Sequence, residues 1–158
     1  MNIFLTKISD DRHRLDVKRE NGSRDGIELE SKSTLVHDFL HFALESSIGT
    51  QEGFWGALAA GKTLADMNDR SGASMREYAG TMADIEQLVG ALTNVAKGTA
   101  SADEIIAAVR NMRAAAGKPV PDWFNAQTIE DVRERMRKLQ GHWNATPFGG
   151  IMELTWNL

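Results

Sequence analysis

The N-terminal third of the chain alternates between apolar and polar residues, with the period of two that a half-buried β-strand shows. The apolar positions fall in three short stretches, at residues 3–8, 13–17 and 27–29. Asn21 and Gly22 lie between the second and third stretches and indicate a hairpin. The pattern therefore predicts an N-terminal group of antiparallel strands.

The parity of the apolar residues decides the register of this hairpin. A two-residue Asn21-Gly22 turn would pair Leu15 with Glu28 and put the two apolar sets on opposite faces. A three-residue loop, residues 20–22, pairs Leu15 with Ile27 and puts both sets on one face. We expect the three-residue loop, with Gly22 in the left-handed region.

Apolar residues three and four positions apart predict helices over most of the remaining chain. The predicted helices run from Ser33 or Thr34 to residue 48, over residues 54–67, along an apolar seam from Met75 to Ala96, from the Ser101 capping box to Gly117, and from Thr128 to Gly141. Residues 151–158 alternate again, with Met152, Leu154 and Trp156 on one face. The chain is thus expected to be a single α+β domain over residues 1–158, with an antiparallel sheet formed by the N-terminal hairpin strands and the C-terminal strand, packed against four to five helices.

Composition narrows the functional classes. The chain has 158 residues, no cysteine and a formal net charge of -4, with acidic and basic residues interleaved. A nucleic-acid-binding protein usually carries a basic excess or stripe, so we expect no nucleic acid as partner. No apolar run approaches the length of a membrane span or a signal peptide, which predicts a soluble, cytoplasmic protein without a membrane partner.

The most informative segment for chemistry is the predicted helix that carries His37 and His41. At 100° per residue, these two histidines fall with Glu45 and Asp38 in one narrow polar stripe on an otherwise apolar helix. Histidines four positions apart can reach one metal ion, and a carboxylate one turn further along can join them. The sequence therefore predicts a divalent metal such as zinc, with His37, His41 and Glu45 as its ligands. The alternative is a solvated helix face without a metal.

Two known helix motifs share part of this pattern. A zinc-protease helix has glutamate directly after its first histidine, whereas this chain has the shorter Asp38 there. The His37-Asp38 pair is also similar to that of the HD phosphohydrolases, but their fold is all-α and the strands expected here argue against it. Of the other histidines, His13 is expected in the core by parity, and His142 is a candidate ligand in a loop.

Residues 56–63 match the phosphate-loop pattern G-x-x-x-x-G-K-[ST] letter for letter. That loop must follow a buried parallel strand and wrap a phosphate with backbone N–H groups. Here the preceding residues are not a buried strand, and residues 57–60 are strong helix formers. We therefore expect no nucleotide cofactor, and expect the glycines to permit close helix packing.

The histidine motif is followed by Gly53-Phe54-Trp55-Gly56, by Ala60-Gly61 and by Thr63-Leu64-Ala65. This combination resembles a family of small uncharacterised bacterial proteins, over about the first half of the chain. The resemblance implies a bacterial, cytoplasmic origin and no particular chemistry.

Two functions of different classes remain open. The first is a small binding or self-associating protein, with a homo-oligomer or a protein partner and no assignable catalysis. The second is a metal-dependent, hydrolase-like enzyme that uses His37, His41 and Glu45.

Overall fold

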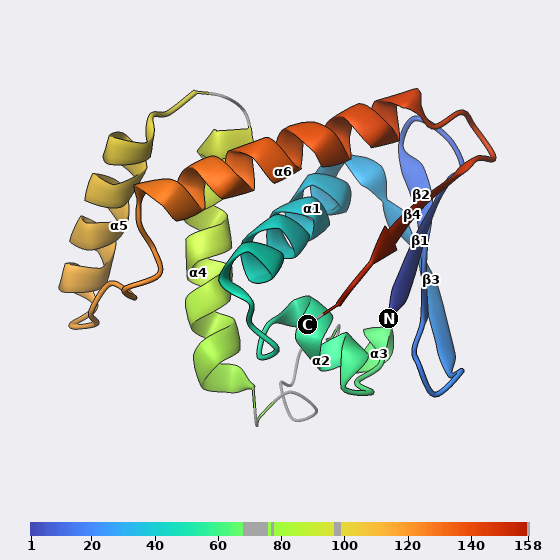
Figure 1. The fold of residues 1–158 in the computed structure, drawn as a ribbon, viewed down its shortest axis with the longest axis horizontal. Helices are drawn as coiled ribbons and strands as arrows, with labels where there is room; N and C mark the ends of the chain where they lie inside the picture. Colours follow the sequence, from blue (N-terminus) through green and yellow to red (C-terminus); the bar gives the residue numbers. More distant parts are fainter. Residues whose placement is uncertain (68–75, 77, 97–98, 158) are drawn as a thin grey trace.

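The computed structural model describes residues 1–67, 76, 78–96 and 99–157. The strands within these ranges form one sheet at one side of the molecule, and the helices pack against one of its faces (Figure 1). The strands are β1 (Asn2–Lys7), β2 (Arg12–Lys18), β3 (Arg24–Glu30) and β4 (Ile151–Thr155). The described helices are α1 (Ser31–Ile48), α2 (Phe54–Ala59), α3 (Leu64–Met67), α4 (Ala79–Ala96), α5 (Ala102–Ala115) and α6 (Ala126–Ala145). The α+β class predicted from the sequence is confirmed.

The sheet is antiparallel throughout, in the order β3-β2-β1-β4. The C-terminal strand pairs with β1, with Leu5 opposite Met152, as the alternation at both ends of the chain predicted. In the hairpin Leu15 pairs with Ile27, and Gly22 has φ 84°, so the three-residue loop is confirmed. The left-handed conformation at Gly22 explains why glycine suits this position.

Two helix boundaries differ from their predicted places because other side chains cap them. Helix α1 begins at Ser31, directly after β3, because the Glu30 carboxylate accepts from the backbone N–H groups of Lys32 and Ser33. Helix α6 begins at Ala126 because the Asn125 side chain accepts from the N–H of Thr128. Polar or acidic side chains near a helix start compete for the same orphan N–H groups, so the sequence alone did not choose among them.

Helix α6 also continues through Gly141 to Ala145, where the sequence predicted a stop. The extra turn buries Trp143, which is 8% exposed. A glycine inside a helix costs about 1 kcal/mol relative to alanine. Burial of an aromatic side chain is worth more than that, so the helix persists.

The predicted helix over residues 54–67 is broken into α2 and α3, which brings the described helices to six rather than four to five. The break occurs at Gly61, whose φ of 112° is incompatible with a right-handed helix. The segment that matches the phosphate-loop pattern therefore begins inside a helix, since residues 56–59 belong to α2. It follows no parallel strand, because the described sheet is antiparallel.

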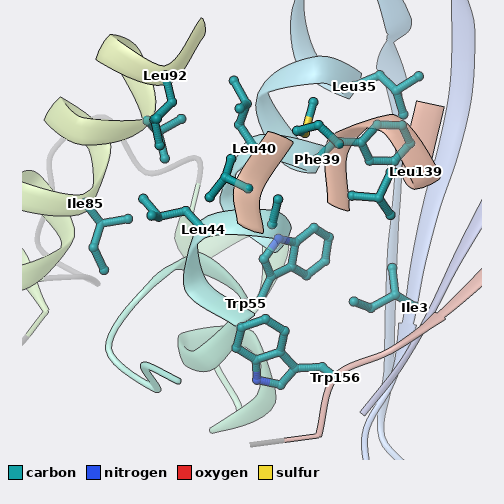
Figure 2. Close-up of a cluster of buried hydrophobic side chains, with 14 of the residues drawn as sticks. Ile3, Leu35, Phe39, Leu40, Leu44, Trp55, Ile85, Leu92, Leu139 and Trp156 are labelled. Atoms are coloured by element: carbon teal, nitrogen blue, oxygen red, sulfur yellow. The ribbon is translucent and has the colours of Figure 1, made fainter. Parts of the chain in front are cut away.

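The buried apolar side chains form one cluster between the sheet and the helices. Figure 2 shows side chains of this cluster from β1, α1, α4 and the two indoles: Ile3, Leu35, Phe39, Leu40, Leu44, Ile85, Leu92, Trp55 and Trp156. Ile85, Val89 and Leu92 are at most 1% exposed, so the described part of the apolar seam is used for internal packing. Met75, where the predicted seam starts, lies outside the described residues.

No helix within the described ranges combines the length and the apolar character needed to cross a bilayer.

Candidate metal centre

The polar stripe of α1 lies mostly inside the protein. His41 is 1% exposed, Glu45 is 0% exposed and Asp38 is 8% exposed, whereas the side chain of His37 is 46% exposed. The interpretation of the stripe as a solvated face therefore holds only for His37. Ionisable side chains are rarely buried unless they are paired with other groups or bind a metal. The buried residues of the stripe are therefore expected to have ionic, hydrogen-bonding or metal partners.

One partner comes from another helix and was missed in the sequence. Glu86 of α4 places its Oε2 3.3 Å from His37 Nε2 and its Oε1 3.2 Å from His41 Nε2. Among the described residues, His37, His41 and Glu86 form the group whose ligand atoms all lie within 4.8 Å of one another. The two histidines face different oxygens of the same Glu86 carboxylate, so a zinc ion held by the two nitrogens could take one or both of these oxygens.

A signal for Glu86 was present in the pattern of α4. At helical spacing, Glu86 borders the apolar face that carries Met82, Ile85 and Val89. An acidic residue at the edge of a buried face is usually solvated, and the Glu86 side chain is 46% exposed. Only the packing of α4 against α1 shows that Glu86 faces two histidines.

Glu45, which the sequence predicted as the third ligand, lies on the other side of the His41 ring. Its Oε1 is 2.8 Å from His41 Nδ1 and accepts from the N–H of Phe54, while its Oε2 accepts from the N–H of Trp55. The carboxylate thus caps the start of α2 and fixes the ring of His41. The structure brings His37 and His41 together as predicted, and Glu86 rather than Glu45 completes the group.

The Gly53-Phe54-Trp55-Gly56 segment is shaped by this packing. A Cβ at Gly53 would lie 2.2 Å from the Cδ of Glu45, so only glycine lets the buried carboxylate reach α2. A Cβ at Gly56 would lie 2.1 Å from the carbonyl oxygen of Gln51. Trp55 is core, and Phe54 packs against the His41 ring at 5.7 Å between centroids.

The surroundings of His41 suit a metal ligand. A carboxylate that accepts from Nδ1–H fixes the tautomer, so the neutral ring presents its lone pair at Nε2. This buried Nε2 makes no regular hydrogen bond within the described part of the chain, and the Oε1 of Glu86, 3.2 Å away, is its ionic neighbour. A buried imidazole nitrogen that lies beside a second histidine and a carboxylate offers ligands that a bound cation would take.

The charges of the group are strongly coupled. The neighbouring carboxylates of Asp38 and Glu86 raise the pKa of His37 to about 9. Burial lowers the pKa of His41, but Glu45 and Glu86 outweigh it and the net shift of that pKa is upward. The two imidazoles, His37 first, hold the pKa of Glu86 well below its usual range. A metal ion must therefore displace protons from both histidines.

The two other histidines lie apart from this group, whereas Asp38 adjoins it, with its Oδ1 4.0 Å from the Nδ1 of His37. His13 is fully buried, as predicted from its parity, and its Nδ1 is 3.0 Å from the Ser31 Oγ. Burial, the largest influence, lowers the pKa of His13. His142 lies on an exposed position of α6 rather than in a loop, and it does not belong to the metal-binding group. Asp38 is buried, and its Oδ2 has no hydrogen-bond partner among the described residues.

A cleft of about 380 Å³ borders the group, and His37, Asp38 and Glu86 contribute to its lining. The candidate centre is thus accessible from one side and held from behind by Glu45. Comparisons with protein-family models, with curated proteins and with solved structures found no match for the chain.

Proposed function

We propose that this protein binds a divalent transition-metal ion, with zinc as the best fit, through His37, His41 and Glu86. The observation that carries the proposal is the buried Nε2 of His41, whose ring is held by Glu45 and whose ligand atom lies within 4.8 Å of those of His37 and Glu86. Imidazole nitrogen and carboxylate oxygen are common zinc ligands. Glu45 orients the ring of His41 and takes no direct part in coordination.

Three protein ligands favour a catalytic centre over a structural one. Structural zinc sites are closed by four protein ligands, whereas catalytic sites keep a position for water or substrate. A metal in such a site supplies a Lewis acid and lowers the pKa of bound water, which serves hydrolysis. The adjoining cleft gives a ligand access to the open position, so we propose a metal-dependent, hydrolase-like enzyme.

A second candidate, a binding or self-associating protein, is supported by a different surface. Ile8, Phe148 and Ile151 are 43%, 61% and 54% exposed. They lie at one end of the β1–β4 pair, since Ile151 pairs with Thr6 and the Gly149 N–H donates to the Lys7 carbonyl. If these side chains form a contiguous apolar patch, that patch would be a contact surface for a protein partner. A mass that stays monomeric in light scattering at high concentration would exclude self-association.

The decisive experiment is metal analysis of protein purified without a histidine tag, followed by thermal unfolding with added zinc. Zinc at a hundred times its dissociation constant stabilises a protein by about 2.7 kcal/mol, which raises the melting temperature by about 5–10 °C for this chain length. His37→Ala should abolish this rise while the protein still folds, because His37 is half exposed. His142→Ala is the matched control and should respond to zinc like the wild type. Equal responses of His37→Ala and the wild type would refute the site.

We further propose that the protein is bacterial and cytoplasmic. The resemblance of the histidine helix and the Gly53–Gly56 segment to a bacterial family supports the origin. The absence of cysteine suits a reducing compartment. Immunofluorescence or fractionation of the native host would test the location.

A further inference from the structure

The helix-facing side of β3 is incompletely covered. Ile27 and Leu29 point to the helices by alternation, as Leu15 and Val17 of β2 do. Leu15 and Val17 are at most 1% exposed, whereas Ile27 and Leu29 are only half-buried. These two side chains contribute to the lining of the cleft that borders the metal-binding group.

Three helices also contribute apolar side chains to the lining. These are Phe54 of α2, Leu64 and Met67 of α3, and Met82 of α4. Methionine side chains adapt to ligands of different shape, because they are unbranched and flexible. A cavity of this size and composition is in the range that binds small organic molecules.

Polar groups that a ligand can reach are concentrated at one place. His37 Nε2 lies 3.3 Å from Glu86, and His37 Nδ1 lies 4.0 Å from Asp38, so the three polar side chains form one end of the lining. The other lining hydroxyls belong to Ser33 and Thr34, and both donate to Glu30 within the first turn of α1. The cleft therefore presents ionisable groups at one place, two hydroxyls engaged by Glu30, and apolar side chains over the rest of its lining.

We propose that this cleft binds a small amphipathic ligand, with an apolar body along Ile27, Leu29 and Met82 and a single anionic, metal-coordinating head group at His37 and Glu86. The inference rests on the proposed metal site and specifies the class of its ligand. A head group such as a carboxylate or hydroxamate coordinates the metal at its open position. The apolar body contributes by removing its methylene groups from water.

The probes are linear hydroxamates from two to eight carbons, added to the cobalt-substituted protein. The visible absorption of cobalt reports metal binding by itself, and its change on titration reports the hydroxamate. Each methylene that enters the cleft should tighten binding about fourfold, since burial of one methylene is worth about 0.8 kcal/mol. The affinity should level off once the chain outgrows the cleft.

Two matched variants locate the effect. Leu29→Ser should flatten the dependence on chain length while the cobalt spectrum and the affinity for acetohydroxamate stay unchanged. Leu154→Ser alters another half-buried leucine on the same side of the sheet, outside the cleft lining, and should behave like the wild type. If the protein binds cobalt but its affinity for hydroxamates does not depend on their chain length, or if both variants have equal effects, then the proposed ligand class of the cleft is wrong and the metal site is still supported. Absence of a cobalt spectrum would overturn the metal site and this inference with it.

Discussion

Replacing Glu45 with glutamine tests the role of the buried carboxylate behind His41. The carboxylate is 0% exposed and engages the N–H groups of Phe54 and Trp55 and the Nδ1 of His41, at 2.8 to 2.9 Å. Glutamine has the same shape but only one acceptor oxygen. Its NH₂ group would face an N–H donor, so at least one buried donor loses its partner.

The size of the effect follows from these contacts. Hydrogen bonds to charged groups are worth about 1.5–3 kcal/mol each, and an unsatisfied buried donor costs about 1–3 kcal/mol. We expect Glu45→Gln to lower the free energy of unfolding by about 3 kcal/mol, or about 6–12 °C in melting temperature for a chain of this size. Because a neutral amide holds the ring of His41 less firmly than a carboxylate does, zinc affinity should also fall about 10–100-fold.

The assay is thermal and urea unfolding, together with zinc titration. Glu134→Gln is the matched control, since Glu134 is half exposed and pairs with Arg137 and Lys138 on the surface of α6. Surface ion pairs of this kind contribute about 0–1 kcal/mol. If the two variants melt at the same temperature and bind zinc equally, then Glu45 neither caps α2 nor orients His41.

Two further predictions concern glycine packing and pH. Gly56→Ala should be strongly destabilising in chemical unfolding, because its Cβ would overlap the backbone of Gln51 at 2.1 Å. Gly141 lies in the penultimate turn of α6, where an added Cβ would have nothing within 4 Å, so Gly141→Ala should stabilise by about 0.5–1 kcal/mol through helix propensity. A smaller loss of stability for Gly56→Ala than for an average core substitution would contradict this packing. Since the pKa of His37 is raised from 6.5 to about 9, its stabilising ion pairs in the metal-free protein should be fully present below pH 6.5 and lost as the pH rises through about 9. Zinc affinity should change in the opposite direction and rise with pH, by about tenfold per pH unit for each proton that the metal displaces. Calorimetry in buffers of different ionisation enthalpy would detect the released protons. A zinc affinity that stays constant between about pH 6 and 8 would show that no proton leaves the site.

Local patterns were enough to predict much of the fold. The alternation of apolar residues placed β4 in the same sheet as the N-terminal hairpin, and parity alone selected the Leu15–Ile27 register. The capping box at Ser101 forms as its spacing predicted, with Glu104 as its second member. Each of these features depends on residues close in sequence or on a strict side-chain period, and both can be read without the rest of the molecule.

Helix boundaries were predicted less well, because several nearby residues could satisfy the same backbone groups. Glu30 caps α1 in place of Ser33 or Thr34, and Asn125 caps α6 in place of Thr128. At Gly141 a local preference against helix is overcome by the burial of Trp143 two residues later. The deciding free energy in that case comes from packing, which local sequence does not contain.

The candidate metal centre likewise has a part that the sequence predicted and a part that only the tertiary structure decided. Helical periodicity by itself put His37, His41 and Glu45 on one side of α1, because residues four apart share a face. Periodicity does not say which elements pack on that face. The tertiary structure placed α2 against Glu45, which made it a cap and a partner of Nδ1, and placed α4 beside the two Nε2 atoms, which made Glu86 the third member of the group. Glu86 is far from the two histidines in sequence and reaches them only because α4 packs against α1. The stripe on α1 was therefore determined by the sequence, and the composition of the centre was decided by the docking of α4.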